Sequence, residues 1–396
     1  MKTGLFILFA GIIYILLNDS LLYLNIKRYL RTRLFRGIFW LHTLLFVAGF
    51  VVYHFLMPRL KGPETYYWIG EGISVFLLFY VPKTCYLLLQ GIALLLKKFT
   101  GTTKVSRILQ YTAVCVPVFF FGLILYGISW GRSDYKVEQV DVVIPDLPDS
   151  FNGLRVVQLT DLHLGSCGKS FKGIAKLVER VNALNPDLIV FTGDMVNNFA
   201  EELEPWIEKL RGLHAPLGVY AVTGNHDYGK YTRWESETAE KENLKRFFEN
   251  MEKAGFRMLN NTNVPLVEGQ DTVFLCGVEN WGLPPFPQIG DLQQALEGTE
   301  GHVVILLSHD PSHWRQEVVN YPVALTLSGH THAMQMGIRI GHFQWSPSQY
   351  IYREYNGLYH ENGHQLYVSR GAGFIGIAGR IAQRPEITLL ELNNRQ

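Results

Sequence analysis

Residues 154–165 read LRVVQLTDLHLG, and this stretch decides the fold of the C-terminal half of the chain. Its first part, LRVVQLT, is a short apolar run rich in branched side chains, which predicts a buried β-strand over residues 154–160. Asp161 and His163 follow directly where the apolar run ends. Open α/β sheets bind their ligands beyond the carboxyl ends of their strands, so we expect these two side chains to belong to a site.

The same pattern recurs along the chain. Further strands are predicted at residues 187–192, 218–223, 303–307 and 323–327. Helical patterns alternate with them, at residues 170–181, 201–211, 238–253 and 291–296. This alternation predicts an α/β fold built of layers. The later strands end at polar motifs, which are Gly193-Asp194, Gly224-Asn225-His226-Asp227, His309-Asp310 and Gly329-His330-Thr331-His332. One such motif is a weak signal, whereas a series of them at strand ends is a strong one.

The residue types in these motifs suit divalent metal ions. Carboxylate oxygen and imidazole nitrogen are ligands of hard and borderline cations. Two ions ~3.5–4 Å apart can clamp a phosphoryl group and lower the pKa of a bridging water. Cysteine is absent from the motifs and the four cysteines form no C-x-x-C pair, so a zinc–thiolate site is not expected. For Cys167 and Cys276, free thiols are favoured over a disulfide.

In these motifs the sequence resembles the calcineurin-like metallophosphoesterase superfamily. The resemblance implies a four-layer α/β/β/α sandwich over residues 153–396. It implies two divalent metal ions, which could be Mn²⁺, Fe²⁺ or Zn²⁺. By the same resemblance, Asp161, His163 and His332 bind one ion, Asn225, His309 and His330 bind the other, and Asp194 bridges them. His226 would contact the scissile phosphate and assist the leaving group, and Asp227 would orient His226.

Two segments narrow the resemblance further. Residues 158–165 and residues 368–373 look like the bacterial branch often called YkuE- or YaeI-like. Some members and relatives of that branch act on lipid-linked pyrophosphates. Arg370 follows a predicted strand at residues 365–369 and could bind a substrate phosphate, although a structural salt bridge is an equal alternative. The aromatic residues between 342 and 367 could form a substrate- or membrane-facing surface, but a β-hairpin packed on the sandwich is favoured.

The N-terminal part of the chain is apolar. Four segments reach the ~20 residues that a membrane span needs, at residues 4–24, 37–57, 68–96 and 111–130. They predict a four-helix transmembrane region over residues 1–131, followed by a linker and first strand over residues 132–152. The first segment lacks an A-x-A-like cleavage site, which disfavours a signal peptide. Asp19 and Lys83 lie inside predicted spans, and we expect them to pair because an isolated charge there is costly.

The basic residues between the spans predict the orientation of the chain. The first loop carries Lys27, Arg28, Arg31, Arg33 and Arg36, and the third carries Lys97, Lys98, Lys104 and Arg107. The second loop carries only Arg59 and Lys61. Loops rich in Lys and Arg stay in the cytoplasm. A multi-pass protein with an extracytoplasmic catalytic domain is therefore expected.

The N-terminal and C-terminal parts of the chain carry net charges of opposite sign. Residues 1–130 hold 13 Lys and Arg against 3 acids, and residues 131–396 hold 23 against 32. The acidic C-terminal part argues against a nucleic-acid partner, which needs a basic surface. We expect a membrane-anchored two-metal phosphohydrolase that cleaves a phosphodiester, pyrophosphate or phosphomonoester, with a lipid-linked substrate as one option. The alternatives are a non-catalytic membrane sensor that keeps the fold, and a nuclease.

Overall fold

The computed structural model describes residues 2–101, 103–340 and 343–395. The chain divides into two compact units, which are considered separately. The first comprises Met1–Lys61 and Trp68–Tyr126, and the second comprises Gly62–Tyr67 and Gly127–Gln396. The short segment Gly62–Tyr67 therefore groups with the C-terminal unit, although the residues on both sides of it belong to the N-terminal one.

The N-terminal unit is built from four long helices. They are α1 (Lys2–Ile26), α2 (Arg33–Leu56), α3 (Thr65–Thr100) and α4 (Thr103–Ser129). In the described part of the chain these four are long and apolar enough to cross a membrane. Each predicted span lies on one of them. Pro82 does not interrupt α3, which has 36 residues and exceeds the ~20 that a span needs.

A buried ion pair joins the helices of this unit. Lys83 Nζ on α3 lies 2.7 Å from Asp19 Oδ1 on α1, which confirms the predicted pairing. Asp19 is fully buried. It also accepts hydrogen bonds from the Thr43 hydroxyl on α2 and the Tyr80 hydroxyl on α3, both at 2.9 Å. The carboxylate is thus saturated with donors, which is what a charge removed from water requires.

The C-terminal unit contains two six-stranded sheets. The order of the first is β1-β14-β2-β3-β4-β5, and that of the second is β12-β13-β9-β8-β7-β6. The strands of the first sheet are β1 (Lys136–Val143), β2 (Leu154–Leu159), β3 (Leu188–Thr192), β4 (Val219–Val222), β5 (Arg257–Met258) and β14 (Glu386–Asn393). Those of the second are β6 (Thr262–Glu268), β7 (Asp271–Gly277), β8 (Val303–Leu307), β9 (Leu325–Ser328), β12 (Gly357–Glu361) and β13 (His364–Val368).

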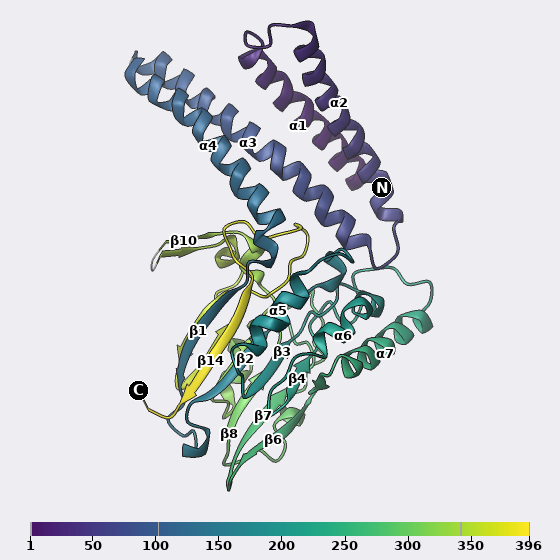
Figure 1. The fold of residues 1–396 in the computed structure, drawn as a ribbon, viewed down its shortest axis with the longest axis vertical. Helices are drawn as coiled ribbons and strands as arrows, with labels where there is room; N and C mark the ends of the chain where they lie inside the picture. The colour runs from purple at the N-terminus through teal and green to yellow at the C-terminus, as the bar shows by residue number, and fades with distance from the viewer. Residues whose placement is uncertain (1, 102, 341–342, 396) are drawn as a thin grey trace. The chain divides into compact units, whose positions relative to one another are not determined.

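The burial of neighbouring residues shows how the layers stack. Val156 and Val190 share a core cluster with Ile305 of the second sheet, so the two sheets pack face to face. The adjacent Val157 lies in another cluster, because successive strand residues point to opposite faces. That cluster contains α5 (Gly173–Asn182), α6 (Ile207–Leu210) and α7 (Glu237–Lys253), which Figure 1 shows along the outer face of the first sheet. The short helices α8 (Leu292–Ala295) and α9 (Ser312–Gln316) cover the second sheet.

The predicted α/β/β/α sandwich is therefore confirmed. Strands β2, β3 and β4 run parallel, as do β7, β8 and β9, so each set brings its carboxyl ends to one edge. A small hairpin, β10 (Ile338–Ile340) with β11 (Phe343–Trp345), stands apart from both sheets. The aromatic segment also contains the antiparallel pair β12–β13 at the edge of the second sheet, as the hairpin interpretation predicted.

Cys167 and Cys276 are both free. Cys167 lies in the core cluster under α5 to α7, and Cys276 lies in the cluster under α8 and α9. The two thiols thus occupy opposite outer layers of the sandwich, which excludes the disulfide.

Candidate metal centre

The polar motifs meet at the carboxyl ends of the parallel strands. Three groups of His and Asp side chains have ligand atoms that all lie within 4.8 Å of one another. These groups are Asp161–His163–His332, His163–Asp194–His226 and Asp194–His309–His330. The sequence motifs that supply them lie up to about 170 residues apart, so the sheets bring them together. Every predicted His and Asp ligand is in one of these groups.

The backbone at the strand ends bends sharply to make the side chains converge. Asp161, His163, Asp194, His330 and His332 all have positive φ, between 46° and 70°. L-residues rarely adopt this conformation, and such strain concentrates at functional sites. The close packing of these loops also requires the glycines of the motifs. A Cβ at Gly224 would collide with the Asp194 carboxylate, and a Cβ at Gly329 would collide with Asp161.

The first group presents two imidazoles to each other. His163 Nε2 lies 3.0 Å from His332 Nε2, and His332 Nε2 lies 3.3 Å from Asp161 Oδ1. Burial lowers the pKa of both histidines well below the usual value, so both rings are neutral and carry a lone pair. Nitrogen lone pairs and a carboxylate oxygen that converge at such distances could hold a cation.

The group Asp194–His309–His330, called the second group below, meets the first group where Asp194 faces His163. Asp194 Oδ2 lies 3.2 Å from His309 Nε2 and 3.5 Å from His163 Nε2, so one carboxylate oxygen faces both groups. His330 Nδ1 lies 3.2 Å from His309 Nε2. Burial lowers the pKa of His309, but the Asp194 and Asp161 carboxylates outweigh it and raise that pKa to about 10. A cation bound here would displace this proton and take its place between Asp194 and the imidazole.

Asn225 fits the second group as a ligand. Its side chain is almost fully buried, and its Nδ2 donates to the Tyr231 hydroxyl at 2.7 Å. Its Oδ1 has no hydrogen-bond partner among the described residues. A buried carbonyl oxygen without a donor costs free energy, which a metal ion at this position would recover. The residues present therefore suit two divalent ions, one held by each group.

Outer contacts orient the imidazoles. His309 Nδ1 donates to the Thr192 carbonyl at 2.7 Å, and His330 Nε2 lies 2.9 Å from the Tyr352 hydroxyl. The buried Arg380 approaches His332, with Nη2 3.4 Å from Nδ1. Such partners select the tautomer and aim the ligating nitrogen. No short sequence motif marks Arg380, and Tyr352 is predicted only as one residue of the aromatic segment.

His226 and Asp227 have separate hydrogen-bond partners, so the expectation that Asp227 orients His226 needs a correction. The His226 Nδ1–H donates to the Asn197 carbonyl at 2.9 Å, which leaves Nε2 free. Asp227 does not orient this ring through its side chain. Its carboxylate instead accepts hydrogen bonds from the backbone N–H groups of Asp194, Met195, Val196 and Gly224 at 2.9–3.1 Å. Asp227 thus holds two ligand loops together, and Asn197 orients His226.

Arg370 is 3% exposed. Its Nε lies 2.6 Å from Glu386 Oε2, and its Nη2 pairs with Glu138. The two alternatives for Arg370 were binding of a substrate phosphate and a structural salt bridge. The structure contains the salt bridge, because the guanidinium pairs with the carboxylates of Glu386 and Glu138.

Comparison with known proteins agrees with this geometry. Residues 154–334 match the family described as Calcineurin-like phosphoesterase, and residues 3–132 match "Probable Calcineurin-like phosphoesterase, transmembrane domain". The chain therefore belongs to the calcineurin-like phosphoesterases, which hydrolyse phosphoester bonds and normally use divalent metals. Within them it is a membrane-associated member, because its N-terminal region holds four candidate membrane-spanning helices.

Three relatives show the range of the similarity. The chain is 35% identical to the Transmembrane protein with metallophosphoesterase domain of Danio rerio over 282 residues, which is 68% of this chain and 60% of that protein. It thus spans less than two thirds of that relative. It is 26% identical over 413 residues to the Uncharacterized metallophosphoesterase Cj0846 of Campylobacter jejuni, covering 99% of this chain and 100% of the relative. It is 29% identical to the UDP-2,3-diacylglucosamine pyrophosphatase LpxG of Chlamydia trachomatis, covering 58% of this chain and 81% of the relative.

Proposed function

We propose that this protein is a multi-pass membrane hydrolase that cleaves a phosphate ester or anhydride with two divalent metal ions. The observation that carries the proposal is the position of Asp194 Oδ2, which faces His163 and His309 at once. One set of ligands would be Asp161, His163 and His332, and the other would be Asn225, His309 and His330. Two bound ions would supply an activated water and neutralise charge on the phosphoryl group.

The chain's own residues would then manage the leaving group. His226 has its Nδ1–H fixed by the Asn197 carbonyl, so Nε2 is the nitrogen that can exchange a proton with a leaving oxygen. Its ring centroid lies 4.9 Å from that of His163, which keeps it beside the metal ligands. Asp227 would act indirectly, because it ties the loop of Asp194 to that of Gly224.

For the substrate, we propose a phosphodiester or pyrophosphate carried by a lipid. One relative is named as a pyrophosphatase of a diacylated glucosamine nucleotide. The connection between the fourth candidate span, which ends at Ser129, and β1, which begins at Lys136, is short. A tether of this length favours substrates whose phosphate lies near the bilayer surface. Acidic residues outnumber basic residues in the C-terminal part, which disfavours nucleic acid as the substrate.

The experiment uses the full-length protein in detergent, loaded separately with Mn²⁺, Fe²⁺ or Zn²⁺. Hydrolysis of bis(p-nitrophenyl) phosphate would be compared with that of the Asp194→Asn variant. The proposal expects metal-dependent turnover in the wild type only. Equal, background rates in both proteins with every metal would instead support a non-catalytic sensor. Mass spectrometry of copurifying lipids, followed by assays on the lipid found and on a soluble nucleotide sugar, would test the lipid assignment.

A further inference from the structure

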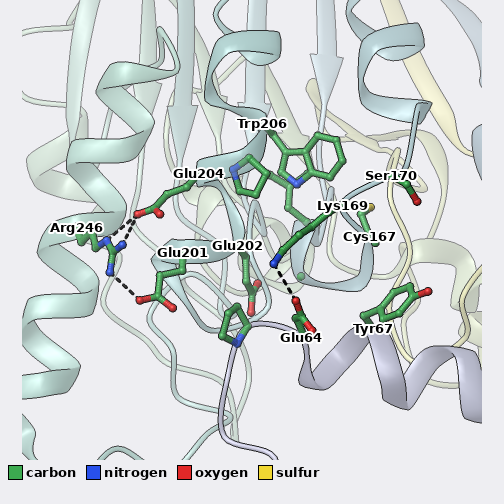
Figure 2. A pocket seen from close by; sticks show the side chains of 15 residues that line it. Glu64, Tyr67, Cys167, Lys169, Ser170, Glu201, Glu202, Glu204, Trp206 and Arg246 are labelled. Carbon is green, nitrogen blue, oxygen red and sulfur yellow. Dashed lines mark hydrogen bonds and ion pairs between the residues drawn. The ribbon is translucent and has the colours of Figure 1, made fainter.

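The segment Gly62–Tyr67, which precedes and begins α3, is part of the catalytic unit. Glu64 Oε1 lies 3.0 Å from Lys169 Nζ. The ring of Tyr67 lies against Gly168, where an added Cβ would come within 3.0 Å of it. Figure 2 shows Glu64 and Tyr67 beside Lys169 and Cys167 in the wall of a cavity of about 680 Å³. This segment therefore packs on the loop that follows the first metal ligands, Asp161 and His163.

Tyr66, in the middle of these contacts, reaches the proton donor. Its ring stands edge-to-face against the His226 imidazole, with ring centroids 6.3 Å apart and an interplanar angle of 84°. Tyr231 contacts the same imidazole with centroids 4.3 Å apart. The His226 ring thus has aromatic neighbours from two separate segments of the chain.

Tyr66 also touches the loop that orients His226. Its side chain interacts with that of Asn198. Asn198 directly follows Asn197, whose carbonyl accepts the Nδ1–H of His226. Tyr66 therefore contacts both the imidazole and the loop that carries its hydrogen-bond acceptor. Residues of this kind hold a catalytic group within the narrow range of productive geometry.

We propose that Tyr66 is a positioning residue for His226, and that the segment Gly62–Tyr67 completes the active site. This inference rests on the proposed function, because it takes His226 as the proton donor. Its consequence is that the beginning of the third candidate membrane span, Thr65–Thr100, helps to complete the active site. Aromatic pairs of this geometry contribute an interaction free energy that corresponds to a roughly 3- to 10-fold change in an equilibrium or rate constant.

The first test measures turnover of bis(p-nitrophenyl) phosphate by full-length Tyr66→Ala, Tyr66→Phe and Tyr29→Ala. Tyr29 is 65% exposed in the connection between α1 and α2 and serves as the matched control. We expect Tyr66→Ala to lower kcat by roughly 3- to 10-fold with KM and bound metal unchanged. Tyr66→Phe should keep most of the activity, because the ring and not the hydroxyl contacts His226. Wild-type kcat in Tyr66→Ala, or a loss of metal that matches the loss of kcat, would overturn the proposal.

A second test does not depend on activity. Diethyl pyrocarbonate modifies accessible neutral imidazoles, and peptide mass spectrometry reports the rate at each histidine. Modification of His226 should be several-fold faster in Tyr66→Ala than in wild type or Tyr29→Ala, while the exposed His302 reacts equally in all three. If the wild type is inactive but His226 is modified faster in Tyr66→Ala, the proposed hydrolase is refuted, whereas the packing of Tyr66 on His226 is supported. If the wild type is active, and Tyr66→Ala changes neither kcat nor the rate of His226 modification, the role of Tyr66 is refuted while the proposed hydrolase stands.

Discussion

At the residue scale, Asp194 is the side chain on which both metal groups depend. Its Oδ2 faces one imidazole from each group, at 3.2 Å and 3.5 Å. Its Oδ1 accepts the backbone N–H of His226 at 2.9 Å. We predict that Asp194→Asn removes most activity and weakens both metal sites, because a neutral amide cannot bridge two cations. Elemental analysis measures the metal per chain, with the exposed Asp146→Asn as control. Two full metal equivalents in an active Asp194→Asn protein would refute the bridging role.

A second prediction at this scale separates proton transfer from metal binding. His226 lies close enough to His163 and Asp194 to be a ligand by distance alone. Its Nδ1 is engaged by Asn197, and we assign it to the leaving group. His226→Ala should therefore keep both metals and lower kcat by roughly 10²–10⁴-fold, the usual range for acid–base assistance. Steady-state kinetics and elemental analysis on one sample check this. Loss of metal together with kcat would make His226 a ligand.

At the element scale, the Asp19–Lys83 pair joins α1 to α3, and Thr43 adds α2. Removing one partner leaves a buried charge uncompensated, which costs on the order of 3–5 kcal/mol. We predict that Lys83→Met lowers the thermal unfolding temperature in detergent, because Asp19 is fully buried. The double variant Asp19→Asn/Lys83→Met should recover most of the loss, since no charge then remains. Equal unfolding temperatures for the single variant and wild type would show that the pair contributes nothing to stability.

At the scale of the whole molecule, the basic loops predict which side of the membrane the catalytic domain occupies. The first and third loops hold five and four basic residues, and the second holds two. Because short basic loops remain in the cytoplasm, we predict an extracytoplasmic C-terminus. Two C-terminal fusions test this, one to a reporter active only outside the cytoplasm and one to a reporter active only inside. Activity of the cytoplasmic reporter alone would overturn the four-span topology and the proposal of an outer-leaflet substrate.

Features that depend on neighbouring residues could be predicted from the sequence. Apolar runs placed the central strands β2, β3, β4, β8 and β9, because burial imposes its pattern over a few residues. The order of polar motifs after those runs placed the candidate ligands, since parallel strands bring their carboxyl ends to one edge. The four long apolar segments became helices for the same local reason, as a span must satisfy its own backbone hydrogen bonds.

Only the tertiary structure decided which groups surround those ligands. His226 is oriented by Asn197, 29 positions earlier in the chain, and not by the adjacent Asp227. Arg370 pairs with Glu138, 232 positions away. Tyr66 meets His226 from the first turn of α3. No short pattern encodes these contacts, because the partners lie far apart along the chain and meet only after the sheets have packed. The motifs therefore specify the candidate ligands, whereas long-range packing specifies the residues that orient them.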